Sequence, residues 1–414
     1  MAAILDGIRV LEFTTAIQGP AAGQYLADLG AEVVKVEPPI GDSARHVGRL
    51  DELGPEAGSQ FVAVNRGKRS VSLDAHSELG RAVLHRLAAR SDVFLSNYRA
   101  PALARMQLDA GTLAALNPTL IYAAVSGFGP LGDDAHKAMV DSAALARGGL
   151  LYMTGPPEGR PMMPGATIAD TGGAMALALG VMTALFARER TGVAHRVDTS
   201  ALSAQLWLQM WELQHAAVAG STPMRAGSHH QMLNGPVGTY TSSDGVHYQF
   251  ALILDVAAWQ AFWAFAGEPA TALDPRWDIP GKQFSVGAGP DDVAAVRACM
   301  LRAFAARTSA EWDVFLAAQP ELICERVRDY AGVLADPQNI ANGTVARMRM
   351  PSGQEVPAIG TPVVFDLQPR THFAGPPARG EGTREIMESL GFEAAEIAAL
   401  EAHTEGVRRR LLGL

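Results

Sequence analysis

The opening third of this chain alternates short apolar runs with helical stretches. Residues 8–13 predict a buried strand, a helix follows the Gly19-Pro20 break and ends near Gly30, and residues 31–37 predict a second strand. A strand, a helix and a strand in succession form a right-handed crossover between parallel strands. Further strands are expected at residues 70–73, 93–96, 120–126 and 195–199. The sequence therefore predicts an α/β fold, in which helices cover both faces of a mostly parallel sheet.

The same alternation predicts the edge of the sheet at which a ligand binds. In open parallel sheets, ligands bind beyond the carboxyl ends of the strands. The dinucleotide fingerprint G-x-G-x-x-G is missing after residues 8–13. NAD and FAD are therefore poor candidates.

Composition limits the classes of function. A chain of 414 residues with 48% hydrophobic and 19% charged residues is typical of a well-packed protein of two domains. Its net charge of −9, with no basic block to offset it, argues against a nucleic-acid partner. Cys299 and Cys324 have neither metal-ligand spacing nor the pattern of a disulfide framework, so a cytoplasmic location is expected. An apolar run of about eighteen residues and a signal peptide are both missing, so we expect no membrane partner.

A change in character along the chain predicts the domain organisation. A large Rossmann-like domain is expected to begin with residues 1–221 and to be completed by residues 331–414. Residues 222–330 contain more turns and aromatic side chains, and Ser243-Asp244-Gly245 is a strong hairpin signal. We therefore expect a smaller α+β domain in the middle of the sequence.

One carboxylate stands out by its position. Asp170 lies at the entrance of a helix of small residues that continues to Arg190, and its flanks are almost wholly uncharged. Gly172 and Gly173 allow another group to approach the backbone closely, and a helix N-terminus presents unpaired N–H groups. Such a carboxylate is either an ordinary N-cap or a nucleophile, and the residue alone favours the cap.

A series of short segments carries a resemblance that spans nearly the whole chain. The segments are residues 5–14, 19–20, 29–38, 65–74, 92–99, 104–106, 126–130, 170–192, 197–200, 238–240, 244–245, 336–337 and 380–385. In this order they resemble the motifs of the family III CoA-transferases. That family contains formyl-CoA transferase and carnitine CoA-transferase, and the α-methylacyl-CoA racemases are its relatives.

The resemblance implies an activity and a nucleophile. It implies that CoA passes from an acyl-CoA to a carboxylic acid, with Asp170 as the covalent nucleophile. Asp170 would form a mixed anhydride with the acyl group and then an aspartyl-CoA thioester, and the acceptor would take the CoA through a second anhydride. Both intermediates hydrolyse readily, so water must be excluded. The resemblance also implies an interlocked homodimer, with CoA as a substrate and no metal or redox cofactor.

The phosphates of CoA require cations, and the chain offers several. The candidates in or near loops beside the predicted strands are Lys68, Arg69, Arg99, Arg105 and Lys137. The resemblance favours Asn97, Arg105 and Lys137 as CoA contacts, and the Gly-rich surround of Gly172 and Gly173 suits a site without water. Family members often carry an arginine after the residue equivalent to Glu37, where this chain has proline, and Arg45 could replace it.

Two alternatives remain open at this stage. A racemase needs a proton-abstracting base, and the His-Asp pair of the racemase branch is matched here by Val140-Asp141. Valine cannot abstract a proton, His136 could substitute, and Asp141 is interpreted as structural or as positioning Asp170. A non-catalytic acyl-CoA binding protein is the third hypothesis.

Several other features do not define a site. His229-His230 has no carboxylate at ligand spacing, so no metal site is expected. The glycine-rich gating loop of formyl-CoA transferase has no counterpart in residues 228–235, so a formyl or oxalate specificity is doubtful. Met162 and Met163 either line an acyl pocket or pack the core, and His229, His230 or Arg225 could hold a second carboxylate of the acceptor.

Overall fold

The chain divides into two compact units. The computed structural model describes residues 3–54, 56–230, 232–233, 235–253, 255–277 and 289–414. Unit 1 comprises Met1–Gly148, Gly165–Gln209 and Leu334–Leu414, and unit 2 comprises Gly149–Pro164 and Met210–Val333. Residues 149–164, which were expected in the large domain, thus lie in unit 2, and the second boundary falls at Met210 and not at residue 222. This division differs from the sequence expectation because a short helical segment before Asp170 packs with the middle of the chain.

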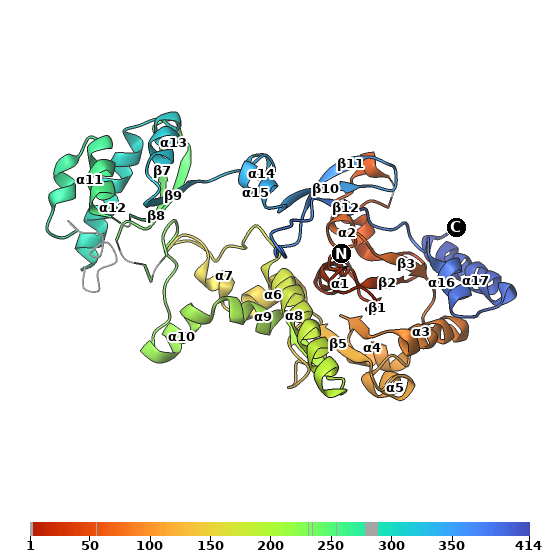
Figure 1. Ribbon diagram of the computed structural model, residues 1–414. Coiled ribbons are helices and arrows are strands. Elements are labelled where there is room, and N and C mark those ends of the chain that lie inside the picture. The colour runs from red at the N-terminus through yellow and green to blue at the C-terminus, as the bar shows by residue number, and fades with distance from the viewer. Residues whose placement is uncertain (1–2, 55, 231, 234, 254, 278–288) are drawn as a thin grey trace. The chain divides into compact units, whose positions relative to one another are not determined.

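A parallel sheet forms the centre of unit 1, which confirms the predicted fold class (Figure 1). Its strands are β1 (Arg9–Phe13), β2 (Glu32–Glu37), β3 (Arg69–Ser72), β4 (Val93–Ser96), β5 (Ile121–Ser126) and β6 (Val197–Ser200). They are ordered β3-β2-β1-β4-β5-β6 and all pair in parallel. The order reverses between β1 and β4, and the loops after these two strands therefore flank the crevice in which such sheets bind ligands.

Two apolar layers cover the faces of this sheet. On one face pack α1 (Gln18–Asp28) and α8 (Ile168–Thr191), and on the other α3 (Glu78–Arg90), α4 (Ala100–Arg105), α5 (Ala110–Leu116), α16 (Thr383–Ser389) and α17 (Ala394–Leu412). Small residues bring α8 close to its neighbours. A Cβ atom at Gly180 would lie 2.6 Å from Val197 Cγ1, and one at Gly173 would lie 2.2 Å from Gln18 Nε2.

Helix α8 has the length and hydropathy of a membrane span, in contrast to the sequence expectation. An 18-residue window of this 24-residue helix has a mean hydropathy of 1.5. Its buried face, which includes Leu177 and Val181, packs into the apolar layer under the sheet. One face of α8 therefore belongs to the core of unit 1.

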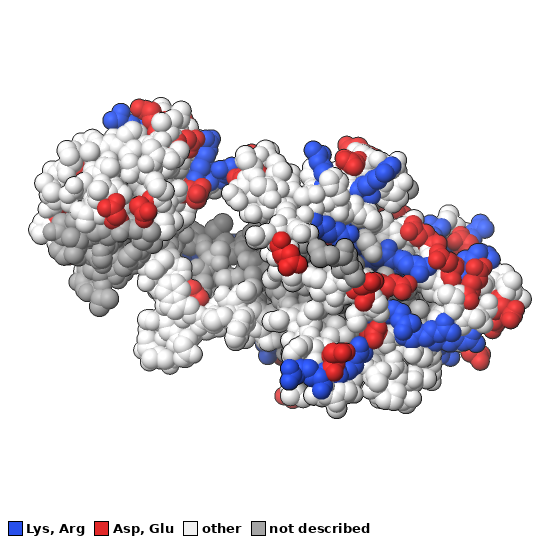
Figure 2. All heavy atoms as spheres, in the orientation of Figure 1, with Lys and Arg blue, Asp and Glu red and all other residues white. Residues whose placement is uncertain are grey.

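The C-terminal part of the chain returns to the N-terminal strands. The hydroxyl of Thr383 accepts a hydrogen bond from Ser72 N at 3.1 Å, and Gly380 N donates to Ser70 Oγ at 2.8 Å. Acidic and basic side chains are interspersed over α16 and α17 (Figure 2), and pairs such as Arg384–Glu401 link the two helices. On this face the charges therefore do not separate into a basic stripe of the kind that binds nucleic acid.

The remaining elements of unit 1 border the sheet. A small sheet with the order β11-β10-β12 contains β10 (Val345–Arg349), β11 (Glu355–Ile359) and β12 (His372–Ala374). The helices are η1 (Ser43–His46), η2 (Asp51–Leu53), α2 (Ser59–Val64), α6 (Asp141–Arg147), α9 (Ala201–Leu208), and α15 (Pro337–Ala341). Helix α14 (Tyr330–Leu334) lies at the boundary of the two units.

Unit 2 is a small α+β body with an aromatic core. Its antiparallel sheet contains β7 (Gly238–Thr241), β8 (His247–Ile253) and β9 (Leu322–Arg326). Its helices are α7 (Leu150–Met153), α10 (Met210–Ala219), α11 (Val256–Phe265), η3 (Pro269–Leu273), α12 (Pro290–Ala305) and α13 (Ser309–Ala317). The side chains of Trp259, Trp263 and Trp312 are fully buried. The predicted hairpin between β7 and β8 is present, with Gly245 at a φ of 85°.

Candidate active site

Asp170 lies in the first turn of α8 but does not cap the helix. Asp141, the first residue of α6, accepts hydrogen bonds at Oδ1 from the amides of Ala169 (2.8 Å) and Asp170 (3.0 Å). Asp141 therefore satisfies the amides at this helix end. The half-buried Asp170 carboxylate accepts no hydrogen bond from any residue that the structure describes. The cap alternative is thus wrong for Asp170, and the positioning role considered for Asp141 has a concrete geometry.

The electrostatic surroundings of Asp170 favour its protonated form. Burial and the nearby Asp141 carboxylate raise the pKa of Asp170 to about 6. Both effects penalise the negative charge, and no cation or side-chain donor among the described residues offsets them. A carboxylate that is ionised at neutral pH, unpaired and more basic than usual is well suited to attack a carbonyl carbon.

This pKa predicts a pH dependence to which burial and the charge of Asp141 both contribute. A carboxylate can act as a nucleophile only when it is ionised, so if Asp170 has this role kcat/KM should fall as the pH drops through about 6. Replacing Asp141 by Asn removes one negative charge yet keeps a side-chain oxygen for the two amides. The acid limb of the pH profile should therefore move to lower pH in Asp141→Asn. A limb that stays in place would show that Asp170 does not set it.

The loop between β1 and α1 forms a fixed turn at the topological switch point. Ala16 adopts the left-handed region with a φ of 64°, a conformation that side chains disfavour by about 1 kcal/mol. Asn97, after β4, donates from Nδ2 to Thr15 O (2.7 Å) and accepts at Oδ1 from Thr15 N (2.9 Å). Asp42 Oδ1 accepts from Thr15 Oγ1 (2.9 Å) and Ala16 N (3.2 Å). Asn97, expected to contact CoA, thus uses both ends of its carboxamide to position this turn.

Three of the predicted cations lie at the carboxyl edge of the sheet. Arg99 and Arg105 flank α4 after β4, and Lys137 lies in the loop after β5. All three side chains are exposed, and no ion pair joins them to another described residue. Lys137 Nζ lies 5.8 Å from the ring centroid of Phe128. Exposed cations without an ion-pair partner in these positions are suited to bind the phosphates of a ligand.

The structure places the other predicted cations elsewhere. Lys68 is buried, with Nζ 2.7 Å from Glu12 Oε2, so its charge is already paired inside the core. Arg69 begins β3 and pairs with Glu32 and Glu385, both at 3.1 Å, which puts its head group at the amino edge of the sheet. Arg45, considered as a substitute after Glu37, is buried and binds Glu37 with Nε and Nη2, each at 2.7 Å. None of these three side chains can bind CoA, as expected from the sequence, without leaving its present partner.

The two glycines after Asp170 differ in their surroundings. Gly172 is half-buried, and a Cβ atom there would lie 3.0 Å from Leu208 Cδ1 of α9. Gly173 is buried, and the group that approaches its backbone is the side chain of Gln18. The close approach that the sequence predicted is therefore made by the protein itself at Gly173.

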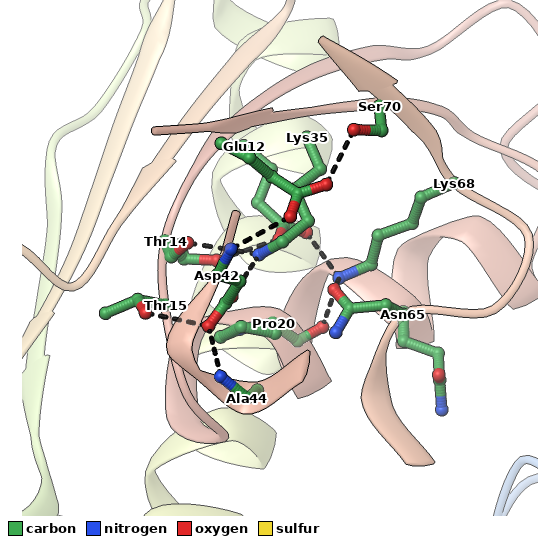
Figure 3. Close-up of polar contacts among 12 residues, drawn as sticks. Glu12, Thr14, Thr15, Pro20, Lys35, Asp42, Ala44, Asn65, Lys68 and Ser70 are labelled. Atoms are coloured by element: carbon green, nitrogen blue, oxygen red, sulfur yellow. Dashed lines mark hydrogen bonds and ion pairs between the residues drawn. The ribbon is translucent and has the colours of Figure 1, made fainter. Parts of the chain in front are cut away.

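A buried cluster of charges lies next to the turn (Figure 3). Lys35 Nζ lies 2.8 Å from Asp42 Oδ2 and 3.2 Å from Glu12 Oε1, and Lys68 binds the other oxygen of Glu12. Burial alone would raise the pKa of Asp42, but Lys35 holds it below its usual range. Burial lowers the pKa of Lys68 to about 8 despite the attraction of Glu12. The strand core thus carries an ion-pair network that ends at the turn holding Ala16.

This network was not predicted from the sequence, although the strands contain a signal for it. Glu12 and Lys35 each interrupt an apolar strand, and they are paired in register across β1 and β2. Opposite charges at matching positions of neighbouring strands predict such a pair.

The side chains of unit 2 that were considered as ligands for a second carboxylate already have partners within the protein. Arg225 donates hydrogen bonds to the carbonyls of Tyr152, Pro156 and Gly159. His229 contacts Val237 O, and His230 contacts the carboxylate of Glu212.

Comparison with known proteins identifies the family. The model of CoA-transferase family III matches residues 5–383. The chain belongs to CoA-transferase family III. The formyl-CoA:oxalate CoA-transferase of Streptomyces coelicolor is 28% identical, and the match covers 96% of this chain and 98% of that protein. The succinate–glutarate CoA-transferase of Agrobacterium fabrum is also 28% identical, over 93% of this chain and 95% of that protein. Together these matches identify this family III protein as a CoA-transferase.

Solved structures of the family agree with the fold. A CAIB/BAIF family protein from Brucella suis has a TM-score of 0.82 and 29% identity, over 94% of this chain and 100% of that one. Rv3272 from Mycobacterium tuberculosis has a TM-score of 0.78 and 28% identity, over 93% and 99%. The family III transferase described here therefore shares the family's fold along nearly its whole length.

Proposed function

We propose that this family III CoA-transferase moves CoA from an acyl-CoA donor to a carboxylic acid acceptor, with Asp170 as the nucleophile. The observation that carries the proposal is the Asp170 carboxylate itself, which is unpaired among the described residues and has a pKa raised to about 6. Its helix end is satisfied by Asp141, so the carboxylate is available for chemistry.

The reaction proceeds in four acyl transfers. Asp170 attacks the thioester carbonyl carbon, so that a C–O bond forms and the C–S bond breaks. The CoA thiolate departs, and the acyl group stays on Asp170 as a mixed anhydride. The thiolate then attacks the aspartyl carbonyl carbon and releases the donor acid, which gives an aspartyl-CoA thioester. The acceptor carboxylate displaces the thiolate from this thioester, and the thiolate finally attacks the acceptor carbonyl and frees Asp170. Each step exchanges one acyl bond for another, so electrons balance without a redox group.

The exposed cations at the carboxyl edge of the sheet support binding of CoA. Arg99, Arg105 and Lys137 project from loops and helix ends that follow β4 and β5. Arginine and lysine side chains without ion pairs bind phosphate oxygens at little cost, because no existing partner must be displaced. We propose that they hold the phosphates of CoA, which acts as a substrate, and that no metal or redox cofactor takes part.

Trapping the covalent intermediate tests the proposal. The protein is incubated with acetyl-CoA or succinyl-CoA, and its intact mass is recorded with new CoA esters from a panel of carboxylic acids. We expect an adduct with the mass of CoA that maps to Asp170, that hydroxylamine removes, and that yields an ester with one acid. New esters without any adduct on Asp170 would contradict the covalent route.

The racemase alternative has no support in this site. Asp141 is engaged by two backbone amides, and Val140 offers no base. His136 is exposed in the loop after β5, and no contact of its side chain with Asp170 is found among the described residues. Solvent deuterium should therefore not enter the α-carbon of a branched acyl-CoA during turnover.

We also propose that the transferase is a cytoplasmic homodimer. The apolar side chains of Met175, Leu179 and Phe186 are 64%, 69% and 64% exposed and share one face of α8. An apolar stripe of this kind is typical of a surface that a second copy covers. Cys299 and Cys324 are both free thiols, as a reducing compartment requires.

A single charged substitution on the apolar stripe of α8 should dissociate the proposed homodimer. We expect Leu179→Asp to lower the mass measured by light scattering from that of a dimer to that of a monomer, because dimerisation would bury the new carboxylate. Leu411→Asp is the control, since Leu411 is a 62% exposed apolar residue of α17 outside the stripe. A dimer that survives both substitutions would exclude this face as the interface.

A further inference from the structure

A buried amide donor without a partner lies beside the helix that carries Asp170. Gln18, the first residue of α1, is only 5% exposed. Its Nε2 atom is enclosed and donates no hydrogen bond to any residue that the structure describes. Buried polar groups nearly always have a partner, because an unpaired donor loses its hydration without compensation. The amide of Gln18 is therefore a donor whose hydrogen-bonding capacity remains available to an acceptor on a ligand.

The position of this amide relative to Asp170 follows from Gly173. A Cβ atom at Gly173 would lie 2.2 Å from Gln18 Nε2, so the carboxamide rests against the backbone of α8 at that residue. Gly173 follows Asp170 by three residues, which places the two on the same side of the helix, about 4.5 Å apart along its axis. The orphaned donor and the unpaired carboxylate thus border the same stretch of α8.

The backbone that carries Gln18 is held rigidly. Two residues before Gln18, Ala16 adopts its left-handed conformation, and the carboxylate of Asp42 accepts a hydrogen bond from its amide. Asn97 binds both the N–H and the carbonyl of Thr15. A donor on such a fixed turn needs little reorganisation when charge develops on an acceptor, which is the condition for strong electrostatic stabilisation.

We propose that the Gln18 carboxamide donates a hydrogen bond to the carbonyl oxygen of the acyl group that Asp170 attacks. The inference rests on the proposed function. As the Asp170 oxygen bonds to the thioester carbon, the π-electron pair of the carbonyl moves onto its oxygen, and Gln18 Nε2–H stabilises this oxyanion. The pair returns when the C–S bond breaks and the CoA thiolate leaves. Gln18 keeps its proton throughout, so it acts as an electrostatic catalyst and not as an acid.

Gln18→Met tests the role of the donor. Methionine has a similar length and fills the space with apolar atoms, but it donates no hydrogen bond. We expect kcat to fall by about 10²- to 10³-fold, the usual loss for one oxyanion donor. The dissociation constant of free CoA should change by less than about threefold, because CoA lacks the acyl carbonyl. A kcat within about twofold of the wild type would overturn the proposal.

Gly173→Ala provides a second test that leaves Gln18 in place. The added methyl group would displace the carboxamide, so kcat should fall, and the double variant should be no slower than Gln18→Met alone. Gly406→Ala in α17 is the matched control, because a Cβ atom there meets nothing within 4 Å, and its kcat should be unchanged. Losses that multiply in the double variant would contradict a shared role.

The two proposals can fail separately. If Asp170 is not the nucleophile, Asp170→Asn keeps its turnover whatever Gln18 does. If only the role of Gln18 is wrong, Asp170→Asn is inactive while Gln18→Met forms the aspartyl-CoA adduct at the rate of the wild type. Circular dichroism melting of each variant shows whether a lost activity reflects a lost fold.

Discussion

Replacing Asp170 by Asn should lower kcat at least about 10⁴-fold while the protein stays folded. The carboxamide has nearly the shape of the carboxylate but cannot attack a thioester and form an anhydride. The α8 helix end should be unaffected, because its amides bind Asp141 and not Asp170. Turnover is measured as the appearance of a new CoA ester, and the CoA-sized mass adduct should disappear in the same variant.

The melting temperature supplies the control for this variant. The pKa of Asp170 is raised to about 6 in the folded protein, so above that pH folding disfavours its ionised form. Removing the charge should therefore leave the melting temperature at pH 7.5 equal to that of the wild type or higher. An inactive variant with a sharply lower melting temperature would leave only misfolding as the explanation, and an active one would remove Asp170 from the mechanism.

Replacing Lys35 by Met should destabilise unit 1 by about 3–5 kcal/mol, the usual cost of removing one partner from a buried ion pair. The side chains of Lys35 and Glu12 are 0% exposed and that of Asp42 is 1% exposed. Among the described residues, Asp42 without Lys35 keeps only backbone and hydroxyl donors, and Glu12 keeps only Lys68 and Thr14. The measurement is the denaturant midpoint, followed by circular dichroism.

Arg384→Met is the matched control for this stability prediction. Arg384 pairs with Glu401 across α16 and α17, and its side chain is 54% exposed. Solvent-exposed pairs contribute at most about 1 kcal/mol, so the midpoint should change little. Equal shifts in the two variants would show that the buried network is not a special source of stability.

Much of the fold was predictable because it follows from local patterns. The alternation of apolar runs and helices predicted the strands of unit 1, and small residues marked α8 as a helix packed closely against its neighbours. The order of the strands was not predictable in this way, since nothing local pairs β1 with β4. The inclusion of residues 149–164 in unit 2 depends likewise on contacts with a segment far along the chain.

The candidate site was predictable only in part, for a related reason. Asp170 was identified from its helix and its resemblance to the family nucleophile, but the cap that frees it comes from Asp141, 29 residues earlier. Lys68 has the residue type of a phosphate ligand, yet Glu12 neutralises it inside the core. Gln18 gave no signal at all, because an orphaned donor exists only once α1 and α8 have packed together.

The return of residues 334–414 to unit 1 also bears on how the protein is made. Arg45 donates to the carbonyl of Pro377 and Arg66 to that of Ile359, so side chains near the N-terminus find partners roughly 300 residues later in synthesis. During translation the emerging sheet lacks these partners until the last segment leaves the ribosome, and contacts of such long range form slowly. Unit 1 can therefore be completed only after the C-terminal segment has left the ribosome.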